Sequence, residues 1–150
     1  KNQSIGVASS KGKTYIHTAG KTAETAKLWN NLPEQDAFLE SMAASAQSVA
    51  DYFGDNILYI NVMNNLSIDC DCDSNPHDPE MKDIGILAST DPVALDQACL
   101  DLVYAVKPTE GNDNRPLVNR IESLHGRHTV DYAETIGLGS KNYELVVLDT

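Results

Sequence analysis

Basic side chains, cysteine pairs and long apolar runs are all scarce in this sequence, and each scarcity excludes a class of protein. Eleven Lys and Arg stand against 22 Asp and Glu, which gives a net charge of −11 and a pI near 4.5. The phosphates of nucleic acids and anionic membrane surfaces repel a chain this acidic. No apolar run approaches the roughly 20 residues that span a bilayer. We therefore expect neither nucleic acid nor a membrane as a partner.

Cysteine is scarce as well, with three residues in 150. An odd number does not make a disulfide framework, and no signal peptide is visible. These features predict a reducing, cytoplasmic location. The length predicts one domain, and the start at Lys1 instead of Met suggests a processed product or part of a longer protein.

Apolar periodicity divides the chain into expected strands and helices. Short strands are expected around a turn at 9–13, and weak helical potential follows at 23–29. Asp91 and Pro92 are a typical N-cap and first helical residue, and Gly54 is a typical helix stop. The expected strands are 4–8, 14–16, 57–63, 84–88 and 143–148, and the expected main helices are 33–53, 92–106, 116–124 and 129–136.

Strands that are apolar throughout, separated by helices, are typical of sheets covered on both faces. The sequence therefore predicts a single α/β domain, with a mostly parallel β-sheet and helices on both faces. Ligands of such sheets gather at the carboxyl ends of the strands. Polar residues follow two expected strands there, and with His125 they form the predicted ligand-binding set: Asn64, Asn65, Ser89, Thr90, Asp91 and His125.

The richest chemistry lies in residues 69–80, which combine two thiols, one imidazole and several carboxylates. Such groups repel one another when buried unless a cation or water satisfies them. The segment is therefore either a solvated acidic loop without metal or a cation site. Its predicted metal ligands are Asp69, Cys70, Asp71, Cys72, Asp73, His77 and Glu80.

Two kinds of cation fit this loop. Asp69, Asp71, Asp73, Asn75, His77 and Glu80 occupy positions 1, 3, 5, 7, 9 and 12 of a calcium-loop template, although Ser74 replaces the usual glycine at position 6. Alternatively, Cys70 and Cys72 with His77 and a carboxylate suit zinc or iron, because thiolates favour those softer metals.

Other motifs have plainer interpretations. The run from Gly6 to Thr14 resembles a phosphate-binding loop but has one residue too many, and a simple hairpin turn fits it better. Cys99 is expected to be a small core residue. His125 and His128 suit a helix C-terminus, where they would cap the helix, although His125 could also reach the predicted site.

The string Ser89–Asp96 (Ser-Thr-Asp-Pro-Val-Ala-Leu-Asp), with residues 61–72 and the tail residues 125–126 and 132–139, resembles the bacterial "domain of unknown function 362" family. The resemblance covers essentially the whole chain and matches the C-terminal half of a longer member. Many members carry ferredoxin-type four-cysteine segments, so it implies an iron–sulfur-associated, redox setting. It implies no reaction or substrate.

This chain has too few cysteines for one all-cysteine cluster. An iron–sulfur cluster in the intact protein would therefore take its ligands mostly from outside the chain. The resemblance implies two partners, the remainder of the full-length protein and an electron-transfer partner. Two hypotheses follow: a domain of a redox protein with a metal or small-ligand site, or a non-catalytic scaffold or calcium-stabilised module. Whether the protein is an enzyme stays open, because no side chain indicates a reaction.

Overall fold

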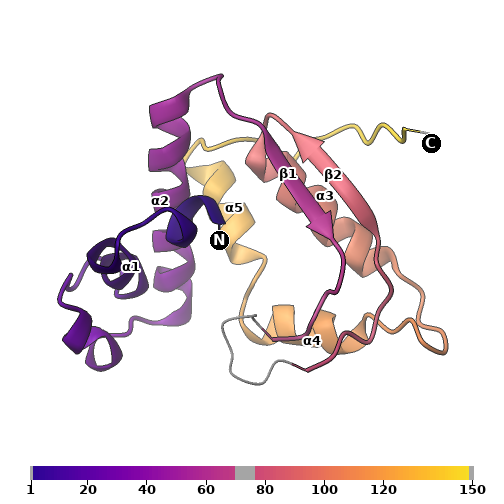
Figure 1. Cartoon of the computed structure of the whole chain (residues 1–150), viewed down its shortest axis with the longest axis horizontal. Coiled ribbons are helices and arrows are strands. Elements are labelled where there is room, and N and C mark those ends of the chain that lie inside the picture. Colours follow the sequence, from indigo (N-terminus) through magenta and orange to yellow (C-terminus); the bar gives the residue numbers. More distant parts are fainter. Residues whose placement is uncertain (1, 70–76, 149–150) are drawn as a thin grey trace. The chain divides into compact units, whose positions relative to one another are not determined.

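The computed structural model of the chain describes residues 2–69 and 77–148. Its contacts form two compact units, Lys1–Ile57 with His125–Gly139, and Leu58–Leu124 with Ser140–Thr150. The elements are a π-helical turn η1 (Asn2–Gly6), α1 (Ser10–His17), a 3-10 helix η2 (Thr25–Asn30), α2 (Gln35–Phe53), β1 (Tyr59–Met63), β2 (Gly85–Ser89), α3 (Pro92–Ala105), α4 (Arg115–Ser123) and α5 (His128–Thr135) (Figure 1).

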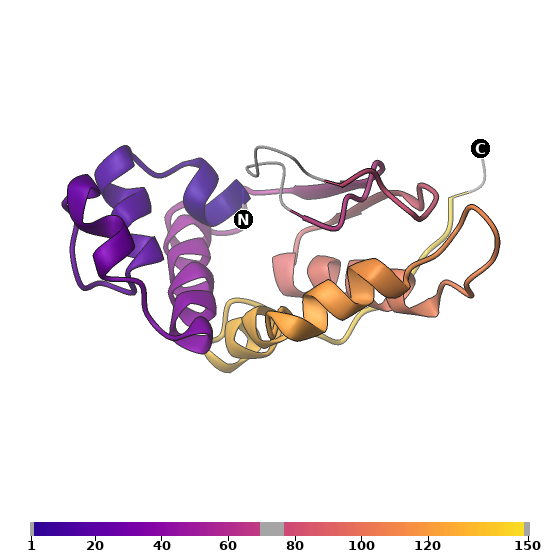
Figure 2. The same cartoon turned by 90° about the horizontal axis from the view of Figure 1, so that it is seen from below.

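The long helix α2 organises the first unit. It begins beyond Pro33, carries Asp36 in its first turn where the helix dipole favours an acid, and ends at Gly54, whose φ of 54° suits glycine. In Figures 1 and 2, α2 lies between α1 and α5. Leu39 and Ala43 of α2 are buried in this packing. Burial of these apolar side chains holds the helices of the unit together.

The strands expected at 4–8 and 14–16 are wrong, because residues 4–6 belong to η1 and residues 14–16 to α1. Ser9 caps α1, its Oγ accepting a hydrogen bond from the backbone N–H of Gly12. Thr14 donates its hydroxyl to the carbonyl of Ser10 and is buried beside Ile16. The β-favouring run Thr14–Ile16 is helical because tertiary burial outweighs a propensity scale of about 1 kcal/mol. The same helix replaces the expected hairpin turn at 9–13.

In the second unit, β1 and β2 pair antiparallel, with Tyr59 opposite Ser89 and Met63 opposite Gly85. The fold is mixed α/β, but the expected mostly parallel sheet with helices on both faces is wrong for the described residues, which form one two-stranded antiparallel sheet. The described residues between the strands contain no crossover helix. A parallel pair requires such a crossover, whereas an antiparallel pair does not.

A small core lies between the sheet and the helices that follow it. Met63, Met81 and Val103 are buried there, and side chains of α3 and α4 pack around them. In Figure 2 the sheet and α3 form two layers. The strand expected at 143–148 is also wrong, since this segment has no regular structure. No helix in the described part of the chain is long and apolar enough to cross a membrane.

Candidate functional site

The predicted ligand-binding residues of the second unit do not share one rim. Asn64 and Asn65 follow β1, whereas Ser89, Thr90 and Asp91 lie where β2 ends. Because the strands are antiparallel, these strand ends lie at opposite ends of the sheet, about 14 Å apart along four residues of strand. The expected convergence therefore does not form. Ligand binding at either end stays a prediction.

Asp91 caps α3, as the sequence predicts. Its Oδ1 accepts hydrogen bonds from the backbone N–H groups of Val93 (2.8 Å) and Ala94 (3.0 Å), and its Oδ2 accepts one from Ser140 (2.8 Å). Ser89 Oγ in turn accepts a hydrogen bond from the backbone N–H of Asp91. Both carboxylate oxygens are engaged inside the protein, which indicates a structural role for this residue.

A polar trio joins β1 to α3. The amide Nδ2 of Asn61 donates to Asp96 Oδ1 at 2.8 Å and to Cys99 Sγ at 3.4 Å. Cys99 is half-buried and packs against the core, as expected, and its sulfur also accepts this hydrogen bond. Sequence reasoning missed this trio; its one local signal was an asparagine inside an otherwise apolar strand.

Burial raises the pKa of the Cys99 thiol, and the charge of Asp96 raises it further, while the hydrogen bond from Asn61 opposes the shift. A thiol held in its protonated form is a poor nucleophile and a poor metal ligand. The trio is therefore better suited to holding α3 on the sheet than to catalysis.

Both flanks of the acidic loop are attached to the segment around α4. At the start of the loop, Asp69 forms an ion pair with Arg120 of α4, with Oδ1 and the guanidinium nitrogen 2.8 Å apart. At its end, the carbonyl of Glu80 accepts a hydrogen bond from the N–H of Asp113 at 2.8 Å, and the N–H of the nearby Lys82 donates to Asn112 Oδ1. The loop thus begins and ends at defined positions.

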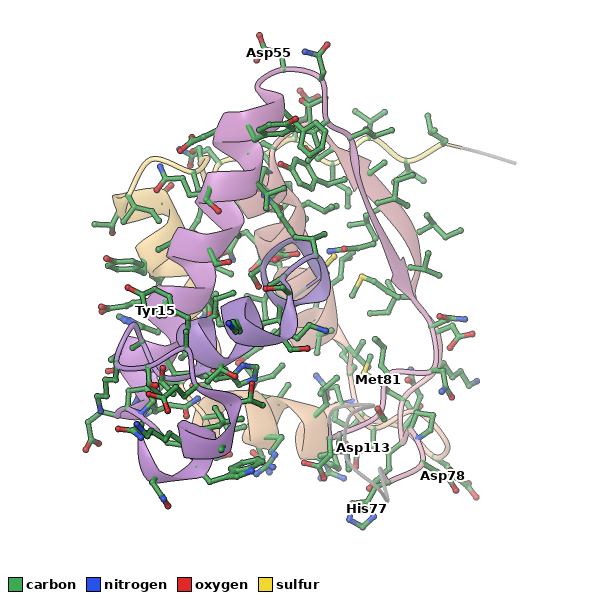
Figure 3. All side chains as sticks on the ribbon, turned by 60° about the vertical axis from the view of Figure 1, so that its left-hand side comes forward. Tyr15, Asp55, His77, Asp78, Met81 and Asp113 are labelled. Carbon is green, nitrogen blue, oxygen red and sulfur yellow. The ribbon has the colours of Figure 1, made fainter. Side chains whose placement is uncertain are left out.

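Of the predicted metal ligands, Asp69, His77 and Glu80 are described, whereas Cys70, Asp71, Cys72 and Asp73 lie outside the described residues. His77 and Glu80 are exposed. Figure 3 shows His77 and Asp78 projecting outward. Among residues 2–69 and 77–148, no group of three or more His, Cys, Asp or Glu side chains is arranged to hold a metal. Asp69, His77 and Glu80 therefore do not form such a group by themselves.

An exposed ion pair lies at the start of α4. Arg115 binds both oxygens of Asp113, with a closest approach of 2.6 Å. These side-chain hydrogen bonds, with one from the Arg115 backbone, lower the pKa of the Asp113 carboxyl. Asp113 is thus paired with Arg115 in this structure.

His125 belongs to the first unit and pairs there with α2. Its Nδ1 lies 2.8 Å from Asp36 Oδ1, and its backbone has a φ of 51°. His128 pairs similarly with Glu40, at 3.0 Å. Both histidines therefore connect the start of α5 to α2. A ligand-binding role of His125 stays a prediction.

The comparisons with known proteins bear on the family alone. No curated protein and no solved structure matched the chain. The family model described as Domain of unknown function (DUF362) matches residues 1–101, a range that includes the Ser89–Asp96 string. Since that match covers most of the sequence, the chain belongs to the DUF362 family.

Proposed function

We propose that this chain is a metal-binding domain whose acidic cysteine loop holds zinc or iron(II). The ligands would be Cys70, Cys72 and His77, with a fourth ligand from one of the carboxylates of the loop, Asp71, Asp73 or Glu80. Thiolate and imidazole donors favour these metals over magnesium or calcium. The observation that carries the proposal is the attachment of both flanks of the loop, through Asp69–Arg120 and Glu80–Asp113. Fixed flanks reduce the entropy lost when a loop closes around an ion.

The ion pair of Asp69 favours a soft metal over calcium. In the calcium template Asp69 is the first ligand, yet its carboxylate binds the guanidinium of Arg120. Calcium would have to compete with the guanidinium of Arg120 for this carboxylate. The affinity of such a loop for calcium depends on the number of charged ligands. Zinc or iron bound through Cys70, Cys72 and His77 does not require Asp69.

An iron–sulfur cluster does not fit this chain alone. The sequence has three cysteines, and the thiol of Cys99 has a raised pKa and accepts a hydrogen bond from Asn61. A redox role in an iron–sulfur-associated protein would need cluster ligands from the remainder of a full-length protein and an electron-transfer partner. We propose the additional cluster ligands and the electron-transfer partner from the family resemblance alone.

Metal analysis of the purified chain tests the proposal. We expect elemental mass spectrometry to find close to one equivalent of zinc or iron per chain. The C70S/C72S double variant is expected to lose this metal. The matched control is C99S, which removes the third cysteine and is expected to keep the metal. Absence of bound metal after zinc or iron(II) is supplied, or equal retention in C70S/C72S, would refute the soft-metal site.

A scaffold role is the second candidate, and the hydrogen bonds of the family string favour it. Asp91 and Asp96 bond to the backbone of Val93, Ala94 and Ser140 and to the side chain of Asn61. A scaffold without metal predicts that C70S/C72S unfolds at the same temperature as the parent protein. A metal site predicts a lower unfolding temperature for the variant.

A further inference from the structure

Residues 1–33, called the basic segment below, differ in charge from the rest of the chain. They contain five Lys and one Glu, a net charge of +4, whereas residues 34–150 contain six Lys and Arg against 21 Asp and Glu, a net charge of −15. In the first unit this segment forms η1 and α1, which lie beside α2, and η2, which packs on α1 (Figure 1). Such charge asymmetry within one chain is typical of a segment that meets a charged partner.

Internal hydrogen bonds give the basic segment a defined shape between α1 and η2. Thr18 is fully buried, and its hydroxyl lies 2.9 Å from the carbonyl of Thr14 and 3.0 Å from that of Thr22. The same hydroxyl accepts a hydrogen bond from the backbone N–H of Thr22. The amine of Lys21 reaches the carbonyl of Leu32 at 3.5 Å, just beyond the end of η2. The exposed side chains of this segment are therefore held on an ordered support.

Three lysines of the basic segment have no acidic partner among the residues that the structure describes. Lys11 and Lys13 are exposed and form no ion pair there, and the amine of Lys21 contacts a carbonyl oxygen instead. Lys27 pairs with Glu24 at 2.8 Å, and both of these side chains are exposed. In a chain with twice as many acidic as basic residues, this positive charge is left available to an outside partner.

An exposed aromatic side chain lies among these cations. Trp29 of η2 is 79% exposed, and Leu32, three residues further on, is 49% exposed. Lys27 precedes Trp29 by two residues, and the amine of Lys21 lies at the Leu32 carbonyl. Tryptophan is enriched among the residues that dominate binding energy, because contact with a partner removes a large ring from water. Trp29 is therefore the expected anchor of a contact that lysines surround.

We propose that the basic segment docks a short acidic segment of a partner protein. An apolar side chain of the partner packs on Trp29 and Leu32, and its carboxylates lie beside Lys21 and Lys27. The charge of residues 34–150 selects this kind of partner, because it repels an extended polyanion such as a nucleic acid. A second copy would bring a net charge of −11 with it, whereas a short segment brings its charges only to the lysines.

The fluorescence of Trp29 tests the proposal directly, because the chain contains a single tryptophan. The probe is a peptide of six glutamates and two leucines, titrated into the whole chain. We expect a saturable blue shift of the emission, since docking removes the indole from water. Added salt should weaken binding, because it screens exposed charges. A peptide with glutamine in place of each glutamate is expected to give no shift.

Two matched double variants separate this surface from a general effect of charge. K21Q/K27Q removes two lysines beside Trp29 and should weaken binding of the acidic peptide about fivefold. K82Q/K107Q removes the same charge from exposed lysines of the second unit. It should bind within about twofold of the parent, because charges further from the contact are screened by salt.

Calorimetric titration tests the anchor without relying on fluorescence. W29A should weaken binding about tenfold, whereas Y52A, at an exposed ring elsewhere in the same unit, should bind as the parent does. Circular dichroism should show that all variants stay folded, since the substituted side chains are exposed. The proposal would be overturned by no emission shift with the acidic peptide, by equal weakening in both lysine variants, or by tighter binding of oligothymidylate. An emission that shifts with protein concentration alone would assign the surface to a second copy and overturn it too.

Discussion

At the scale of single residues, Asp91 has the clearest energetic consequence. It accepts three backbone hydrogen bonds at the start of α3. We expect D91A to lower the free energy of unfolding by about 1–2 kcal/mol, the usual cost of losing an N-cap. D91N should cost less, because it keeps one acceptor oxygen. Urea unfolding measures both, with T90A at the exposed neighbouring position as the control; equal stability of D91A and T90A would contradict the capping role.

Cys99 gives a second prediction at this scale, through its raised pKa. In a C70S/C72S background the remaining thiol should alkylate more slowly than an unfolded thiol, whose pKa is about 8.5. D96N removes a charge that disfavours the thiolate, so it should speed the reaction. The folded state keeps the proton of the Cys99 thiol to higher pH than the unfolded state does. The contribution of this thiol to the free energy of unfolding therefore falls as the pH rises above about 8.5, the pKa of the unfolded thiol. A slower reaction in D96N would show that the Asp96 charge is not a cause of the shift.

At the scale of elements, the packing of α5 on α2 depends on small residues. Ala43 and Ala133 are 2% and 5% exposed, and Gln47 Nε2 donates to the carbonyl of Ile136 at 2.9 Å. We expect A43L to destabilise the protein by roughly 1–3 kcal/mol through overpacking. A44L, at the adjacent exposed position, should change stability by less than about 0.5 kcal/mol. Thermal unfolding compares the two, and equal effects would exclude close packing at Ala43.

Elements with local signals could be predicted from the sequence, and elements defined by distant contacts could not. Gly54 and the Asp91–Pro92 pair correctly indicated where α2 ends and α3 begins. The helix α1 was missed because the residues Thr14–Ile16 have a strand propensity, which burial of Thr14 and Ile16 in the folded protein outweighs. The direction of β1 and β2 was missed because an apolar run does not encode its partner. The Asn61–Asp96 bond joins residues 35 apart, so periodicity could not reveal it.

At the scale of the whole molecule, the acidic charge is concentrated in one unit. Residues 58–124 and 140–150 contain fourteen Asp and Glu against five Lys and Arg, a net charge of −9 of the total −11. A divalent cation in the loop of this unit would relieve part of that repulsion. We expect added zinc to raise the unfolding temperature, with about 2.7 kcal/mol of stabilisation at a free concentration a hundred times the Kd. Calorimetry with and without chelator measures it; no shift in the parent, or the same shift in C70S/C72S, would contradict a site at the two thiols.

The most direct test of the proposed site is thiol alkylation, followed peptide by peptide across pH before and after chelation. Metal ligation requires Cys70 and Cys72 as thiolates and shields them from reagents. After chelation the neighbouring carboxylates disfavour the thiolate, so both should react no faster than ordinary thiols. We expect Cys70 and Cys72 to be protected until a chelator is added, while the alkylation rate of Cys99 stays unchanged. Alkylation of both residues at the same rate with and without chelator, in protein that contains no metal, would contradict it.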